Sequence, residues 1–141
     1  MSHRPELIDE TLIGHLIAEA RRARANAYAP YSNYRVGAAL ATEGGKIFVG
    51  CNVENASFGA TVCAERNAIA QMIVAGATKP IACVIVTAGP TPAPPCGMCR
   101  QVLIEFTRDM PVILVGESDV GDVRRDLELA DLLPEVFELD A

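Results

Sequence analysis

The sequence has 141 residues, which is enough for one domain with a hydrophobic core and too few for two, so we expect a single domain over residues 1–141. Half of the residues are hydrophobic and 21% are charged, which excludes a disordered, collagen-like or coiled-coil chain. The formal net charge of −6 argues against a surface that binds nucleic-acid polymers, because such surfaces concentrate Lys and Arg. A small neutral ligand is the favoured partner.

The N-terminal segment lacks the apolar core of a signal peptide, and no apolar run approaches the roughly 18 to 20 residues that cross a bilayer. We therefore expect a cytoplasmic protein with no membrane partner. In that reducing compartment, the five cysteines fit metal ligands or buried thiols better than a disulfide framework.

The first half of the chain predicts a helix followed by a hairpin. Apolar residues recur at helical spacing over residues 5–27, and Pro30 with its neighbouring turn residues ends that pattern. Two short β-type stretches, residues 35–42 and 46–52, are separated by Glu-Gly-Gly, which predicts a β-hairpin.

The second half alternates helices and strands. Helical spacing over residues 63–75, ending near Gly76, and over 96–106 predicts two helices. The apolar run 81–88 predicts a buried strand. A strand at 111–116 and a short helical segment around 129–134 follow, with room for one more strand. This order indicates the α/β class, with a mixed sheet and helices packed on its faces.

Three cysteines have the spacing of a metal site. Cys96 and Cys99 form a CxxC pair at the start of one predicted helix, and Cys63 starts another. Three protein ligands leave the fourth position of a tetrahedral zinc open to water, as in catalytic sites. The N-terminus of a helix favours the thiolate form that a metal requires. Glu65, two residues after Cys63, can face the substrate instead of the metal.

A CxxC pair alone also fits a redox dithiol or a structural zinc site, and the other candidate ligands bear on that choice. A closed structural site needs a fourth Cys or His, but His3 and His15 are far in sequence from the cysteines. His15 is expected to face solvent on its helix. Cys51 and Cys83 fall in predicted strands, where a free Cys is usually a small buried hydrophobic residue.

Several motifs together resemble one family. CAER at residues 63–66 and PCGMCRQ at 95–101 resemble the zinc deaminase signature. AYAPYSNYRVGAAL (27–40), GCNVENAS (50–57) and LLPEVF (132–137) are similar to the corresponding blocks of small homotetrameric cytidine deaminases. The resemblance implies a three-layer α-β-α sandwich of about five strands. It also implies a Zn²⁺ cofactor and hydrolytic deamination of cytidine and 2′-deoxycytidine in pyrimidine salvage.

The resemblance also implies roles for individual residues. Cys63, Cys96 and Cys99 would bind the zinc, and Glu65 would carry protons between water and the base. Asn52 and Glu54 would hydrogen-bond the ribose hydroxyls.

The remaining implied contacts concern the base and the subunit interfaces. The backbone around Ala64 would help to read the pyrimidine. Tyr34 stands where the family usually has Phe, and Phe58 where it usually has Tyr, which leaves the preferred cytidine analogue open. Phe58 and Phe137 match aromatic residues that reach a neighbouring subunit's pocket in a homotetramer with shared active sites. Read without the family, both phenylalanines would be core residues.

Arg66 is expected to compensate the negative charge of three thiolates by donating hydrogen bonds to their sulfurs. The alternative is an ordinary surface arginine on the helix.

Three other functions stay open at this point. One is deamination of a modified cytosine nucleoside such as blasticidin S. Another is editing of a polynucleotide, which would need a basic groove. The last is a non-catalytic zinc-stabilised module, against which the placement of Glu65 argues.

Overall fold

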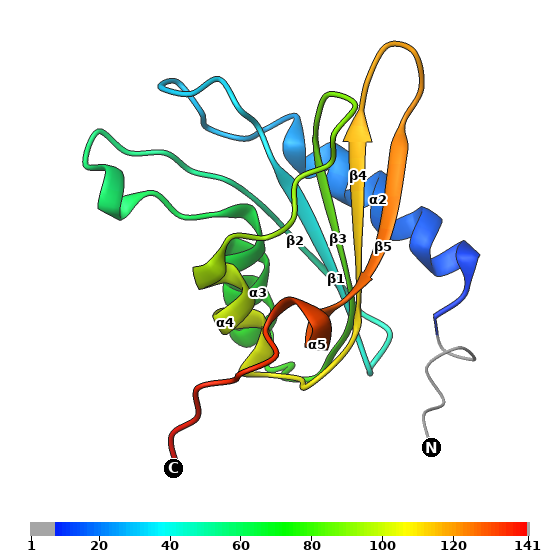
Figure 1. Cartoon of the computed structure of the whole chain (residues 1–141), viewed down its shortest axis with the longest axis vertical. Coiled ribbons are helices and arrows are strands. Elements are labelled where there is room, and N and C mark those ends of the chain that lie inside the picture. The colour runs from blue at the N-terminus through cyan, green and yellow to red at the C-terminus, as the bar shows by residue number, and fades with distance from the viewer. Residues whose placement is uncertain (1–7, 141) are drawn as a thin grey trace.

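The computed structural model describes residues 8–140, in which helices and strands alternate (Figure 1). Its elements are α2 (Glu10–Arg24), β1 (Gly37–Thr42), β2 (Ile47–Cys51), the short 3₁₀ helix η1 (Phe58–Ala60), α3 (Ala64–Val74), β3 (Pro80–Ala88), α4 (Gly97–Ile104), β4 (Pro111–Glu117), β5 (Val123–Glu128) and α5 (Leu129–Leu132). Each predicted helix and strand is present, and β5 is the additional strand.

The limits of the first helix differ from the prediction. Within the described residues, α2 begins at Glu10, because Asp9 caps it by accepting a hydrogen bond from the backbone N–H of Leu12 at 2.8 Å. Residues 5–7 of the predicted helix lie outside the described part of the chain. The helix ends at Arg24 instead of continuing to residue 27.

The five strands form one mixed sheet in the order β2-β1-β3-β4-β5. Strands β3 and β4 are parallel, since α4 crosses over between them, and the other neighbours are antiparallel. The predicted β1–β2 hairpin is confirmed, with Ala41 opposite Ile47 and the turn residue Gly45 at φ +82°. The sheet confirms the α/β class.

Helices cover both faces of this sheet and give three layers. In Figure 1, α2 lies behind the strands, whereas α3, α4 and α5 lie in front of them. Because successive side chains of a strand point to opposite faces, the sheet separates two hydrophobic clusters. On β3, Val84 and Val86 pack with α2, whereas Cys83 and Ile85 pack with α3 and α4. The three-layer α-β-α prediction is confirmed. No helix within residues 8–140 has the length and apolar character needed to cross a membrane.

A close approach between β2 and α3 fixes the start of α3. A Cβ atom added to Gly50 would lie 2.4 Å from the carbonyl oxygen of Ala64 and 2.5 Å from the backbone nitrogen of Ala68. Such distances are incompatible with a side chain unless the helix moves. Only glycine at residue 50 therefore lets the first turn of α3 rest on the strand.

Gly50→Ala is expected to destabilise the protein by about 3 kcal/mol, because the methyl group would push against helix backbone in a filled core. Chemical denaturation measures this difference. Gly14→Ala is the matched control, since Gly14 is exposed in α2 and its added Cβ meets nothing within 4 Å. That control is expected to stabilise the protein by about 0.5 to 1 kcal/mol. Equal effects of the two substitutions would contradict this account of Gly50.

Candidate metal and proton-transfer site

Two helices begin beside one another near the carboxyl end of β3. Cys63 is the N-cap residue of α3, and Cys96 is the N-cap residue of α4. Cys99 lies one turn into α4 and is fully buried. The partial positive charge and free N–H groups at the start of each helix favour negative charge at this point.

The three predicted cysteines form one cluster. Their sulfurs all lie within 4.8 Å of one another, and those of Cys63 and Cys96 are 3.9 Å apart. Sulfur ligands of a tetrahedral zinc are about 3.8 Å apart, as follows from a Zn–S bond of about 2.3 Å. Cys96 is exposed, so the cluster has an open side. The geometry and the softness of the three sulfurs fit zinc.

Proton sharing within the cluster shows why a cation suits it. A hydrogen bond from the Cys99 thiol, helped by Arg66, lowers the pKa of Cys63 to about 5. The same contact raises the pKa of Cys99, because that thiol keeps the shared proton. Two thiolates this close repel each other unless a positive ion lies between them.

Arg66 lies against this cluster, as predicted. One terminal nitrogen donates to the carbonyl oxygen of Thr61 at 3.1 Å and lies 3.9 Å from the sulfur of Cys63. Its Nε atom is buried without a hydrogen-bond partner among the described residues. The guanidinium therefore places positive charge beside the sulfurs, and it is not an ordinary surface arginine.

Glu65 is a buried carboxyl group beside the cluster. Glu65 lies on the first turn of α3 and is only 5% exposed. Burial is the main cause that raises the pKa of Glu65 to about 7, and the negative charge of Cys63 adds to it. A buried carboxyl group with this pKa can both accept and donate a proton near neutral pH.

Glu65, Cys63 and Cys96 border a cavity of about 220 Å³. The cavity is bounded by three loops, the start of α3 and the end of β3, and its lining residues are Tyr34, Val36, Asn52, Thr61, Cys63, Ala64, Glu65, Ile85, Thr87, Ala93, Pro94 and Cys96. A larger hollow of about 380 Å³ lies at the opposite end of β3, beside Lys79 and Phe106, and contains none of the cysteines. The cavity at the cysteines is therefore the candidate site.

Four of the predicted substrate-site residues line this cavity: Tyr34, Asn52, Ala64 and Glu65. The amide of Asn52 is held on both sides, because its oxygen accepts from the backbone of Val36 at 2.9 Å and its nitrogen donates to the carbonyl of Tyr34 at 2.8 Å. The backbone N–H of Asn52 also donates to the carbonyl oxygen of Val36 at 3.2 Å, so Asn52 is tied to the segment just before β1. The strand itself begins at Gly37 and not at the predicted residue 35.

Three other predicted residues lie outside the cavity. The carboxylate of Glu54 accepts hydrogen bonds from the backbone N–H groups of Tyr31 and Ser32, at 2.9 and 3.1 Å, and from the Ser32 hydroxyl. The Ser32 hydroxyl bond is the main reason that the pKa of Glu54 is lowered. Phe58 is 79% exposed and Phe137 is 68% exposed. The expectation that both phenylalanines would be core residues, made without the family, is therefore wrong.

The floor of the cavity contains two residues that the sequence did not predict as part of the site. Ile85 and Thr87 lie on the face of β3 that packs toward α3 and α4, and both are buried. Thr87 is a polar residue at the end of an apolar strand. Because ligands of α/β sheets bind at the carboxyl ends of strands, its position was the available signal.

The remaining Cys and His predictions have mixed outcomes. Cys83 is fully buried and His15 is exposed, as expected. Cys51 lies at the end of β2 and is only half-buried, whereas a buried residue was expected. His3 lies outside the described residues.

Comparison with known proteins places this geometry in a family. Residues 11–115 match the family model described as "Cytidine and deoxycytidylate deaminase zinc-binding region". A cytidine deaminase of Sporosarcina psychrophila is 44% identical over 123 residues, covering 86% of this chain and 88% of that protein. A cytidine deaminase of Mycobacterium tuberculosis (strain H37Rv) is 39% identical over 127 residues, which is 89% of each chain.

Solved structures agree with the sequence comparison. The crystal structure of cytidine deaminase from Burkholderia pseudomallei superposes with a TM-score of 0.82 at 42% identity and covers 97% of this chain and 100% of that chain. The chain belongs to the cytidine and deoxycytidylate deaminase family. The matched region is the family's zinc-binding region, and within the described residues the three clustered cysteines are the group that could hold a metal ion.

Proposed function

We propose that this protein is a zinc-dependent deaminase of free nucleosides, which converts cytidine and 2′-deoxycytidine to uridine and 2′-deoxyuridine with release of ammonia. The observation that carries the proposal is the buried carboxyl group of Glu65 at a cavity beside a three-cysteine cluster. Membership of the deaminase family and the names of relatives at 39 to 44% identity support the substrate.

In this proposal Cys63, Cys96 and Cys99 hold the zinc, which when bound supplies Lewis acidity that lowers the pKa of a water ligand toward 7. Glu65 accepts a proton from the attacking water and passes it to N3 of the base while the water oxygen bonds to C4. Glu65 then takes the second proton of that water to the 4-amino group. The C4–N4 bond breaks, ammonia leaves, and the proton at N3 stays in the uridine.

The remaining residues would orient the nucleoside. Tyr34 offers an aromatic face to the base, and the backbone around Ala64 reads its polar edge. Asn52 and Glu54 are proposed to bind the ribose hydroxyls. Asn52 already borders the cavity, whereas Glu54 needs to exchange its bond to the Ser32 hydroxyl for one to the ribose.

Incubation of the purified zinc-loaded protein with cytidine, following the loss of cytosine absorbance, tests the proposal. We expect stoichiometric formation of uridine and ammonia. Parallel reactions with 2′-deoxycytidine, blasticidin S and single-stranded DNA separate the alternatives. Turnover of blasticidin S or DNA without turnover of cytidine would overturn the proposed substrate. A protein that binds zinc and converts none of these would be a non-catalytic module.

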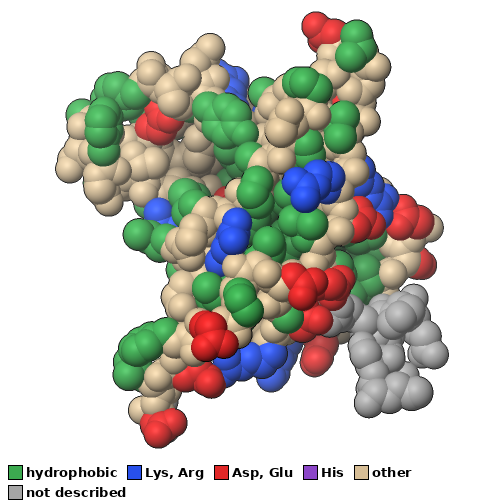
Figure 2. Space-filling view, in the orientation of Figure 1, with side chains coloured by type: hydrophobic (Ala, Val, Ile, Leu, Met, Phe, Trp, Pro, Cys, Tyr) green, Lys and Arg blue, Asp and Glu red, His purple; other side chains and the backbone are tan. Residues whose placement is uncertain are grey.

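We also propose a homotetramer in which neighbouring subunits complete each active site. Exposed aromatic side chains support this assembly, since monomers rarely expose large contiguous apolar patches. Tyr31, in the loop between α2 and β1, and Phe58, in η1, form an edge-to-face pair with ring centroids 6.4 Å apart. Figure 2 shows hydrophobic side chains on the part of the molecule that projects at the upper left, where Figure 1 places both segments. Phe137 lies near the C-terminal end and is equally uncovered.

Light scattering with gel filtration tests the assembly. Phe58→Ala with Phe137→Ala is expected to shift the protein from tetramer to smaller species and to reduce kcat/KM by about tenfold or more, because each substitution removes a large apolar contact. Val120→Ala is the control, since Val120 is 96% exposed on the β4–β5 turn. A monomer with full activity would contradict the shared-site assembly.

The proposal extends to the domain organisation, the compartment and the pathway. We propose that residues 1–141 act as one catalytic domain in the cytoplasm. Its uridine and deoxyuridine products would enter pyrimidine salvage.

A further inference from the structure

Two segments that are distant in sequence form opposite walls of the cavity. One wall contains Tyr34 and Val36, before β1, and the other contains Ala93, Pro94 and Cys96, before α4. Each wall is a loop, so its position depends on its contacts with the rest of the protein on the side away from the cavity. Asn52 binds the first wall directly, and Thr87 and Arg100 bind the second. Further contacts of both loops lead to Glu117, the last residue of β4.

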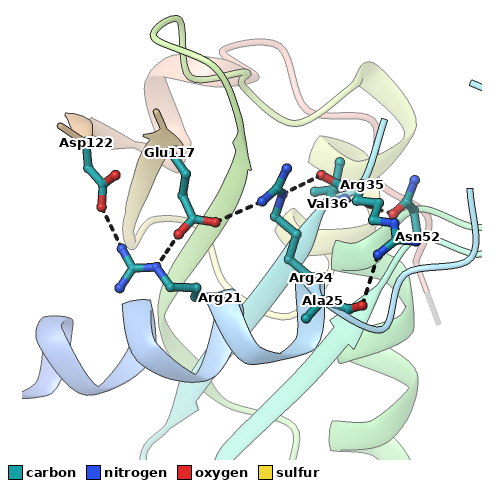
Figure 3. A network of polar contacts seen from close by, with 8 residues as sticks. All are labelled: Arg21, Arg24, Ala25, Arg35, Val36, Asn52, Glu117 and Asp122. Carbon is teal, nitrogen blue, oxygen red and sulfur yellow. Dashed lines mark hydrogen bonds and ion pairs between the residues drawn. The ribbon is translucent and has the colours of Figure 1, made fainter. Parts of the chain in front are cut away.

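The first wall is held by Arg24, the last residue of α2 (Figure 3). Its Nε atom donates to the carbonyl oxygen of Arg35 at 2.9 Å, between the two wall residues. One terminal nitrogen of the same guanidinium pairs with the carboxylate of Glu117 at 3.0 Å. The side chains of Arg24 and Glu117 are 24% and 20% exposed, so this pair is less screened by water than an ordinary surface ion pair.

The loop that leads to the second wall is anchored at its start by the backbone of Glu117. The carbonyl oxygen of Glu117 accepts a hydrogen bond from the N–H of Gly89 at 2.7 Å. The adjoining Gly116 packs so closely that an added Cβ would lie 2.4 Å from the oxygen of Gly89 and 3.2 Å from the nitrogen of Pro92. The loop that leads to Cys96 therefore starts from a fixed point on β4.

We propose that Arg24 and Glu117 are positioning residues that fix the separation of the two cavity walls and thereby set the affinity for the nucleoside. Glu117 connects the two loops. Its carboxylate binds Arg24, which holds the loop before β1, and its backbone carbonyl binds Gly89 at the start of the loop before α4. Neither residue lines the cavity, so they act through the loops that they hold. This inference rests on the proposed function.

The chemistry of arginine suits this role, because its planar fork can serve two acceptors at a fixed angle. The carbonyl of Arg35 and the carboxylate of Glu117 are those acceptors. A lysine would keep the charge but could not hold both in the same geometry. Substitution of the Glu117 side chain would remove the carboxylate that pairs with Arg24 and with Arg21, while leaving the backbone bond to Gly89 in place.

Arg24→Ala is expected to raise the KM for cytidine and the Kd for uridine in parallel, by about five- to tenfold, with kcat retained. Arg24→Lys should restore part of the affinity, and Glu117→Gln should give a smaller change in the same direction. Because Arg24 and Glu117 share one ion pair, the double variant should lose less affinity than the sum of the two single changes. Calorimetry with uridine measures binding independently of turnover.

Arg124→Ala is the matched control. Arg124 also joins α2 to the sheet, through Glu10 at 2.7 Å, but it contacts neither cavity wall within the described residues. We expect its KM and uridine Kd to equal those of the wild type. Unchanged KM and Kd in Arg24→Ala, or a loss of melting temperature or kcat alone, would overturn the inference. An unmodified protein that leaves cytidine intact would instead overturn the proposed function, and this inference with it.

Discussion

Glu65→Gln is expected to lower kcat/KM for cytidine by about 10³-fold or more while zinc stays bound, because glutamine keeps the shape of the side chain but cannot carry a proton. The reaction needs the same carboxyl group twice, first for N3 of the base and then for the amino group. Among the described residues that line the cavity, Glu65 has the only carboxyl group, so no neighbouring carboxylate can take over its role.

Steady-state kinetics and metal analysis of the same preparation measure this effect. Glu105→Gln is the matched control, since Glu105 is an exposed carboxylate at the end of α4, and it should keep full activity. If Glu65→Gln retained a tenth of the activity with normal zinc content, proton transfer by Glu65 would be excluded. A loss of zinc in that variant would mean that Glu65 also supports the metal.

The second large effect is expected for Cys99→Ser. Cys99 is fully buried in the cluster, and a serine hydroxyl does not ionise near neutral pH, so the site loses one of three ligands. Zinc affinity should fall by at least about 100-fold, and turnover should fall with it. Because a metal that binds the folded state stabilises it, zinc should raise the melting temperature of the wild type far more than that of the variant.

Zinc titration followed by thermal unfolding checks this expectation. Cys51→Ser is the control, because Cys51 is a half-buried thiol outside the cluster and should leave zinc binding intact. Full zinc occupancy in Cys99→Ser would contradict the three-cysteine site. Loss of zinc in Cys51→Ser would show that the cluster has another member.

The sequence was sufficient to predict the fold class because its local patterns are strong. The apolar run 81–88 corresponds to the central strand β3, and the Glu-Gly-Gly turn lies between β1 and β2. The ends of elements were less predictable, since they depend on contacts between distant residues. The segment just before β1, for example, is bound by the side chain of Asn52, which contacts the backbone of Tyr34 and Val36.

The same division applies to the site. Cysteine spacing indicated the Cys96–Cys99 pair, because residues three apart lie on one face of a helix. The placement of Cys63 in the same cluster is a contact between two helix starts, and only the resemblance to the deaminase family implied it. The position of Thr87 in the cavity floor depends on which face of β3 it occupies, and a continuous apolar run does not reveal that face. The exposure of Phe58 and Phe137 is likewise a tertiary property, since aromatic residues are more often buried than not.

The sheet keeps the cluster around α2 apart from the cluster that carries the cavity. Ile13, Leu16 and Ala20 pack only on the α2 side, where no cavity residue belongs to the cluster. This face is therefore the place to engineer a more heat-resistant enzyme, since repacking it can add stability without disturbing the catalytic groups. Natural variation is expected to follow the same partition: the buried apolar residues of α2 can vary as long as their packing volume is kept, whereas Arg24 at the end of the helix should not.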